Sequence, residues 1–307
     1  MRAFFSLVLL LAACAETPGV ETAGGETACG FAARSTLPIT RVGPFAGVPS
    51  AIDGSPVILL VDTGAGHTVL SADAARRGGV AADMQHAVRA TGIGGTSINP
   101  TGNVRQLLLG NIRVEPAVVT VMPSVPLADG NIGMDILGDV DLDIDMMAGR
   151  ITLNRGSLCP GEGPPWGVAA TEFRTEARMP RQLPNAARPR LLLLAMQLDG
   201  VPALAMLDTG AGHTVVARAF AARLGVTDAA LAAGPALRLA GLSPQAGQGR
   251  PWKFREALIG NERFAGPVMV VADLHDPGFD VLLGMDYLAT HRIWLSYRAR
   301  RIFVALP

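Results

Sequence analysis

An eight-residue string occurs twice in the chain, letter for letter. It spans Asp62–Val69 and again Asp208–Val215. Each copy follows an apolar run, Val57–Val61 in the first case and Leu204–Leu207 in the second. An apolar run of this length that ends in Asp-Thr-Gly predicts a buried strand entering a tight loop, in which the glycine permits the turn. The string therefore places one carboxylate at the end of each buried strand, where a charge without a partner would be costly.

The repetition extends well beyond the two strings. Pairs of matching residues that lie 146 positions apart are Asp53 with Asp199, Asp62 with Asp208, and Gly138 with Gly284. A further pair, Gly110 with Gly260, lies 150 positions apart. We therefore predict a duplicated domain in which the second half carries a small insertion followed by a compensating deletion. A pseudo-twofold axis between the halves would bring the two aspartates together.

The string Asp-Thr-Gly-Ala resembles the active-site loop of aspartic peptidases, in the form typical of their retroviral-type branch. Bacterial members of this clan include chains that carry two such loops. The resemblance covers both halves, from about residue 37 to the C-terminus. It implies an all-β fold of two retropepsin-like lobes that form a pepsin-like bilobal cleft. It also implies aspartic endopeptidase activity on peptides or proteins, with Asp62 and Asp208 as the catalytic pair and no metal or cofactor.

The resemblance also assigns roles to the residues that follow each aspartate. The two threonines would interlock the loops across the axis, and the two glycines would leave room for the substrate backbone. Alanine follows each glycine, where the pepsin branch has a hydroxyl that favours the ionised carboxylates, so we expect an activity optimum in the weakly acidic to neutral range. These active-site loop residues are Thr63, Gly64 and Ala65 in the first half and Thr209, Gly210 and Ala211 in the second.

A glycine-rich stretch, Thr91–Thr96, resembles the tip of a retroviral-type flap, where glycine suits a lid that moves and donates backbone hydrogen bonds. A plain glycine-rich turn is the alternative interpretation. The matching stretch, Ala240–Gln245, has a different sequence, so we expect two unequal flaps. The residues expected to form flaps and bind substrate are Gly92, Ile93, Gly94, Gly95, Gly241 and Leu242.

Two further features resemble parts of the same clan. The strings Ile136–Gly138 and Leu282–Gly284 resemble the hydrophobic-hydrophobic-glycine element that packs behind each active-site loop. His67 and His213 follow the loops, and we expect them to hydrogen-bond the loop or line the edge of the cleft rather than take part in catalysis.

The N-terminal residues indicate export. A basic Met1-Arg2 precedes an apolar segment, Ala3–Ala13, that is too short to span a membrane as a mature helix. The segment ends in Leu-Ala-Ala-Cys, which resembles a bacterial lipobox. We therefore predict a lipoprotein signal peptide over residues 1–14, lipidation of Cys14, and a periplasmic protein that is anchored to a membrane by lipid alone. An ordinary secretory signal is the alternative.

The remaining cysteines, Cys29 and Cys159, flank the first half. In an exported protein such a pair more often forms a disulfide than stays reduced, so we predict that these two are bridged. The five histidines show no ligand pattern with cysteines or carboxylates, and no metal site is predicted.

The predicted domains are a flexible tether over 15–36, lobe 1 over 37–154, a proline-rich linker over 155–190 and lobe 2 over 191–307. Within the linker, residues 168–175 could still form a strand between the lobes. The formal net charge is zero, with 26 basic and 26 acidic residues, which gives no indication of nucleic-acid binding. We expect a monomer in which the lobes pair within one chain, although the linker also permits a domain-exchanged dimer. A non-catalytic peptide-binding module on the same fold is the rival function. Two buried like charges argue against it, because a binder has no need of them.

Overall fold

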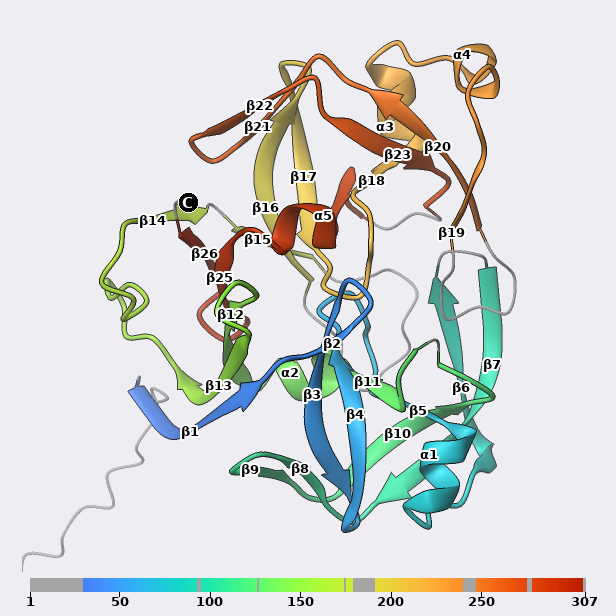
Figure 1. The fold of residues 1–307 in the computed structure, drawn as a ribbon, viewed down its shortest axis with the longest axis vertical. Coiled ribbons are helices and arrows are strands. Elements are labelled where there is room, and N and C mark those ends of the chain that lie inside the picture. The colour runs from blue at the N-terminus through green and yellow to red at the C-terminus, as the bar shows by residue number, and fades with distance from the viewer. Residues whose placement is uncertain are drawn as a thin grey trace, which may run out of the picture.

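The computed structural model describes residues 30–92, 95–125, 127–173, 175–178, 191–239, 247–274 and 278–305. These residues form three β-sheets and five short helices. One ten-stranded sheet comes from each half of the chain, and a six-stranded sheet takes strands from both halves (Figure 1). The expected all-β fold with two similar lobes is therefore confirmed.

The sheet of lobe 1 has the strand order β6-β7-β10-β5-β11-β4-β3-β8-β9, and β2 also pairs with β3. Its strands are β2 (Thr40–Val42), β3 (Phe45–Ile52), β4 (Ser55–Val61), β5 (Val69–Ser71), β6 (Asp83–Gly92), β7 (Gly95–Val104), β8 (Leu107–Leu109), β9 (Ile112–Val114), β10 (Ala117–Met122) and β11 (Gly130–Ile132). The helices are α1 (Ala72–Arg77) and α2 (Met134–Leu137). Ser71 caps the first helix, since its side chain accepts a hydrogen bond from the Ala74 N–H.

The sheet of lobe 2 has the equivalent order, β19-β20-β23-β18-β24-β17-β16-β21-β22, with β15 paired to β16. Its strands are β15 (Thr175–Arg178), β16 (Leu191–Leu198), β17 (Val201–Leu207), β18 (Val215–Ala217), β19 (Leu237–Leu239), β20 (Gly247–Lys253), β21 (Glu256–Ile259), β22 (Glu262–Ala265), β23 (Val268–Ala272) and β24 (Val281–Leu283). The helices are α3 (Arg218–Arg223), α4 (Asp228–Ala232) and α5 (Met285–Leu288).

Matching hairpins open the two lobes. Asp53-Gly54 joins β3 to β4, and Asp199-Gly200 joins β16 to β17. All four residues have positive φ, between 46° and 87°, which is the backbone geometry that Asp-Gly favours in two-residue hairpin turns. Each hairpin fixes the register of the strand that leads to one of the two aspartates.

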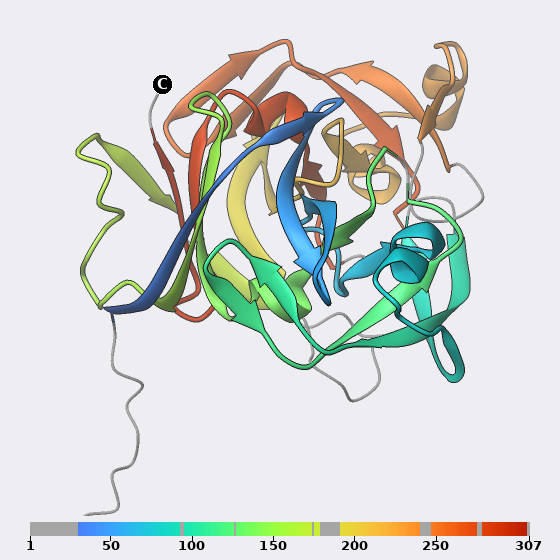
Figure 2. The ribbon, with the colours of Figure 1, turned by 60° about the horizontal axis from the view of Figure 1, so that its bottom comes forward.

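The six-stranded sheet joins the two halves. Its order is β1 (Gly30–Pro38), β13 (Arg150–Ser157), β12 (Val140–Asp145), β25 (Arg292–Ser296), β26 (Arg301–Ala305) and β14 (Ala170–Phe173). The halves meet where β12 pairs with β25 in antiparallel register. The Arg292 guanidinium there donates to both oxygens of the buried Asp143 carboxylate, at 2.9 and 2.7 Å. Figure 2 shows β1 and β13 side by side in this sheet.

The predicted tether ends too late in the sequence. Residues 30–36, assigned to the tether, belong to β1, which pairs with β13 through Pro38. This strand was not predicted, because its partners are distant in the sequence and only one face of it is buried, at Ser35 and Leu37. In the linker, β13 continues to Ser157, and β14 lies within the stretch 168–175 that was expected to allow a strand and pairs with β26.

Candidate active site

Each of the two aspartates lies at the end of a central strand. Asp62 follows β4, and the chain returns through β5 after the loop. A third strand, β11, lies between β4 and β5, parallel to the first and antiparallel to the second. The same arrangement of β17, β24 and β18 surrounds Asp208 in lobe 2. Each loop is therefore held at its base by three hydrogen-bonded strands.

The two loops interlock through their threonines. The Thr63 N–H donates to the Thr209 hydroxyl at 3.1 Å, and the Thr209 N–H donates to the Thr63 hydroxyl at 3.1 Å. The hydroxyls in turn donate across the interface, from Thr63 to the Leu207 carbonyl at 2.7 Å and from Thr209 to the Val61 carbonyl. Both threonines are buried. The predicted contact between the loops is present, and it fixes one aspartate relative to the other.

The glycine of each loop packs on the aspartate of the other lobe. A Cβ atom added to Gly64 would lie 2.3 Å from the Asp208 carboxyl group, and one added to Gly210 would lie 2.5 Å from that of Asp62. Distances this short exclude any side chain at either position. The glycines therefore allow the two lobes to approach until the carboxyl groups of Asp62 and Asp208 hydrogen-bond to each other.

The pair has an unequal set of hydrogen-bond donors. Oδ1 of Asp62 accepts from the N–H groups of Gly64 and Ala65, both at 3.0 Å, and Oδ2 accepts from the Asn131 side chain at 2.8 Å. Oδ1 of Asp208 accepts from the Gly210 N–H at 2.8 Å. The sequence analysis did not identify Asn131 as a residue of the site.

The surroundings of the pair raise both pKa values. Burial raises the pKa of Asp62, and hydrogen bonds from Gly64 and Asn131 oppose that effect. Burial, followed by the negative charge of Asp62, raises the pKa of Asp208 to about 8. Both residues keep part of their surface exposed, so solvent water reaches the pair. One shared proton at neutral pH is the expected state of two carboxyl groups this close.

The loops are braced from behind by a Gly-Met-Asp string that occurs once in each lobe. Asp135 accepts hydrogen bonds from the Thr68 N–H at 2.9 Å and from its hydroxyl at 2.7 Å. Asp286 accepts the same two bonds from Thr214, at 2.8 and 2.6 Å. The preceding glycine, Gly133 or Gly284, donates to the same threonine hydroxyl. These contacts hold the far end of each active-site loop.

The predicted position of this bracing element in lobe 1 is wrong. Gly284 corresponds to Gly133, since each is the N-cap of a short helix and packs on the backbone of the loop histidine, His67 or His213. Ile136 and Leu137 lie inside α2, and Gly138 is its C-cap. Gly133 and Gly284 are 151 positions apart, so the insertion in lobe 2 has no compensating deletion before this point. The shared Gly-Met-Asp string was the signal that would have given the correct match.

The comparisons with known proteins agree with this geometry. A family model described as Aspartyl protease matches residues 48–136 and 194–287, which together make up more than half of the chain. The chain belongs to the aspartyl protease family. The two matched regions correspond to the two lobes, and the family lies in the retropepsin-like clan that the resemblance indicates.

A solved structure with the same fold is the aspartic proteinase from Irpex lacteus. It is 15% identical in sequence with a TM-score of 0.51, and the match covers 89% of this chain and 97% of that one. At this identity the likeness extends to the fold alone. No curated protein matches the chain.

The residues expected to form flaps are only partly within the described structure. Gly92 and Gly95 pair with each other at the end of the β6–β7 hairpin, whereas Ile93 and Gly94 lie outside the described residues. Gly241 and Leu242 also lie outside them. The two hairpins are unequal in their described parts, since β6 and β7 have 10 residues each while β19 has 3 and β20 has 7. Their role as lids stays a prediction.

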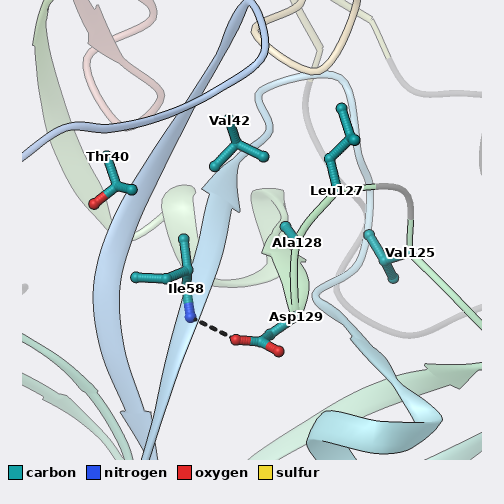
Figure 3. A pocket seen from close by; sticks show the side chains of 7 residues that line it. All are labelled: Thr40, Val42, Ile58, Val125, Leu127, Ala128 and Asp129. Atoms are coloured by element: carbon teal, nitrogen blue, oxygen red, sulfur yellow. Dashed lines mark hydrogen bonds between the residues drawn. The ribbon is translucent and has the colours of Figure 1, made fainter.

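An open pocket of about 430 Å³ lies on lobe 1, beside the strand that leads to Asp62 (Figure 3). Asp129 lies at one side of this pocket and accepts a hydrogen bond from the Ile58 N–H at 2.9 Å. Neither aspartate of the pair lines it, so we assign it no part in the chemistry. The lining residues are Thr40, Val42, Ile58, Val125, Leu127, Ala128 and Asp129.

Two features are absent from the residues that the structure describes. No group of three or more His, Cys, Asp or Glu side chains in this part of the chain could hold a metal ion. No helix in it has the length and apolar character needed to cross a membrane.

Proposed function

We propose that the protein is an aspartic endopeptidase that hydrolyses peptide bonds with a water molecule activated by Asp62 and Asp208. The observation that carries the proposal is the contact between the two carboxyl groups, each at the end of its own strand. The reciprocal hydrogen bonds of Thr63 and Thr209 support it, because they hold the pair in register. Protease chemistry of this class is what the family match supports.

The proposed reaction uses one proton that the pair shares. The ionised carboxylate takes a proton from water as the water oxygen bonds to the peptide carbonyl carbon. The protonated carboxyl group donates its proton to the carbonyl oxygen, and a tetrahedral diol forms without a covalent enzyme intermediate. Collapse of the diol breaks the C–N bond, and a proton from the pair goes to the leaving nitrogen. The raised pKa of Asp208, about 8, supports a shared proton that persists at neutral pH.

The test is hydrolysis of a peptide library by the purified protein and by two variants. Asp62→Asn and Asp208→Asn each remove half of the acid–base pair, so each is expected to lower kcat/KM by about 10²–10⁴-fold or more. A pepstatin-like inhibitor with a statine hydroxyl is expected to bind the wild type and to lose affinity for both variants. Asp73→Asn, on the exposed face of α1, is the matched control and is expected to keep full activity.

The rival function is a peptide-binding module without catalysis. Binding of library peptides by wild type and both variants alike, with no cleavage product in any of them, would establish that function and exclude ours. Activity retained by Asp208→Asn alone would contradict a single site made from both lobes.

We further propose that the protein is exported and anchored by a lipid on Cys14. The sequence of residues 1–14 supports this, and those residues lie outside the described structure. Cys14→Ser is expected to release the protein into the soluble periplasmic fraction, and mass spectrometry should find the lipid on Cys14 of the wild type. An unmodified Cys14 would exclude the anchor.

We propose that the functional unit is a monomer. A single chain supplies both aspartates, and β12 of one half pairs with β25 of the other within that chain. Sedimentation of the active protein at the mass of one chain is the expected result. A stable dimer in which each site needs both chains would contradict it, and mixing Asp62→Asn with Asp208→Asn protein would reveal this by restoring activity.

A further inference from the structure

Asn131 occupies a central position behind the catalytic pair. It lies on β11, opposite Leu60 of β4 and Val69 of β5, and its side chain is 1% exposed. Its Nδ2 group donates to Oδ2 of Asp62 at 2.8 Å. Because the adjacent strands enter and leave the active-site loop, they hold this amide in place against the carboxylate.

The equivalent position in lobe 2 has no such donor. The match of Gly133 with Gly284 places Leu282 at the position of Asn131, and the leucine side chain is apolar and buried. The two lobes are otherwise alike around their aspartates, with the same loop string and the same Gly-Met-Asp brace. Asn131 therefore breaks the symmetry of the site, because it gives a side-chain hydrogen bond to Asp62 that Asp208 does not receive from the equivalent position.

The asparagine at this position is unfavourable for the free energy of folding. Oδ1 of Asn131 is buried and has no hydrogen-bond partner among the residues that the structure describes. A buried polar atom without a partner is unfavourable, and a leucine at this position would avoid the loss. The orientation of the amide follows from its partner, since an ionised carboxylate only accepts hydrogen bonds and must face the NH₂ group. The interaction with Asp62 is thus what the side chain provides.

We propose that Asn131 is a positioning residue that assigns the two roles within the pair, holding Asp62 as the ionised member and leaving the shared proton on Asp208. This inference rests on the proposed function. Asp62 then takes the proton from water, and Asp208 gives its proton to the peptide carbonyl oxygen. The asparagine acts through Asp62 and does not itself exchange a proton.

The electrostatics of the site agree with this assignment. Burial raises the pKa of Asp62, and the donors Gly64, Asn131 and Ala65 oppose it. Burial and the charge of Asp62 raise the pKa of Asp208, and backbone hydrogen bonds from Gly210 and Ala211 oppose them. Tyr297, which follows β25, is a further titratable group that interacts electrostatically with both aspartates. Burial is the main cause that raises the pKa of Tyr297, and the charges of the two aspartates raise it further, so Tyr297 stays neutral.

The test compares Asn131→Leu with wild type by two measurements. The first is carboxyl ¹³C NMR of protein labelled at aspartate, with the signals assigned through Asp62→Asn and Asp208→Asn. The second is the pH profile of kcat/KM on one peptide. In the wild type, Asp62 is expected to report the lower of the two titration steps and Asp208 the upper.

Loss of the donor in Asn131→Leu is expected to raise the lower step by about one to two pH units, the range typical of a hydrogen bond to a charged group. The upper step should stay in place, because the donor stabilises Asp62 equally before and after Asp208 ionises. The active pH range should therefore narrow from its acidic side. If Asn131 had a purely structural role, Asn131→Leu would instead lower the melting temperature and would not change the pKa of one titration step selectively.

Asn154→Leu is the matched control, since Asn154 is as buried as Asn131 but lies in the six-stranded sheet, where its amide donates to the Asp141 carbonyl. It is expected to lower the melting temperature and leave both titration steps unchanged. If Asn131→Leu fails to fold, Asn131→Ala can replace it, because it removes the same donor and should raise the pKa of the lower titration step in the same way. A lower step that stays in place in the folded variant would overturn the inference, as would a wild type in which Asp208 titrates first.

The NMR titration does not require activity. If the wild type cleaves no peptide, the proposed function fails while the titration still decides the role of Asn131 in ionising the pair.

Discussion

Thr63 and Thr209 exchange hydrogen bonds across the junction of the two lobes, each backbone N–H donating to the hydroxyl of the other at 3.1 Å. This contact joins residues 146 positions apart and places the aspartates that precede them side by side. The buried threonines therefore connect the stability of the lobe interface to the geometry of the proposed catalytic pair.

Removal of one threonine hydroxyl should lower both the stability of the lobe interface and the activity of the proposed catalytic pair. Thr63→Val keeps the shape of the side chain but leaves the buried Thr209 N–H without its acceptor, so we expect a loss of about 1–3 kcal/mol in the free energy of unfolding. Activity should fall as well, because the pair loses its alignment. Thr63→Ser keeps the hydroxyl and should recover most of both properties. Ser55→Ala, which removes an exposed hydrogen bond from the Ser55 hydroxyl to the Arg77 carbonyl, is the control and should change little.

The pH dependence of activity should have a basic limb near pH 8. The active form carries one proton on the pair, and this proton is lost as pH rises through the pKa of Asp208, about 8. Ala65→Ser combined with Ala211→Ser adds hydroxyl donors that favour the ionised carboxylates, so the double variant should shift this limb to lower pH. The measurement is kcat/KM against pH on one peptide. A strongly acidic wild-type optimum, or an upward shift in the variant, would contradict the argument.

The same raised pKa predicts that Asp208 destabilises the fold at neutral pH. The folded state keeps the proton of Asp208 up to about pH 8, whereas an unfolded aspartate releases it at its ordinary pKa of 3.8. Folding is therefore penalised progressively as pH rises from about 4 to about 8. Asp208→Asn should melt at a higher temperature than wild type at pH 7, with little difference at pH 3. A difference that does not vary with pH would refute this.

The ion pair between Asp143 and Arg292 should be sensitive to the removal of one partner. Asp143 is buried, and its carboxylate is bound by Nε and Nη2 of the Arg292 guanidinium, so Arg292→Met leaves a buried charge and should cost about 3–5 kcal/mol. Replacing both residues, with Asp143→Leu added, should recover much of that loss. The exposed pair of Arg263 and Glu256 is the control, and Arg263→Met should cost under about 1 kcal/mol. Chemical denaturation of the four proteins measures these differences.

The predicted disulfide between Cys29 and Cys159 is testable by thiol labelling. Gly30 pairs with Ser157 in the register of β1 and β13, and Cys29 lies outside the described residues. Labelling of the folded, exported protein should find neither thiol, and Cys159→Ser should lower stability by about 3–5 kcal/mol through the lost loop closure. Full labelling of Cys159 in the wild type would exclude the bridge.

The repeated string made the fold and the aspartate pair predictable from sequence. Local chemistry alone places Asp62 and Asp208 at strand ends, because an apolar run followed by Asp-Thr-Gly has few other structures available. The Asp53-Gly54 hairpin and the Ser71 helix cap were predictable for the same reason, since each depends on residues adjacent in the chain.

Pairings over long distances in the sequence were decided only by the tertiary structure. The sequence assigns β12 to lobe 1, yet in the sheet it lies between β13 of the same half and β25 of the other half. Strand β1 was assigned to a tether because its partners, on β13, are more than one hundred positions away. Asn131 is the clearest case. The role proposed for Asn131 depends on its hydrogen bond to Asp62 and on its structural equivalence to Leu282 of lobe 2. Neither can be read from the residues beside Asn131, because backbone pairing between distant strands determines which side chains meet.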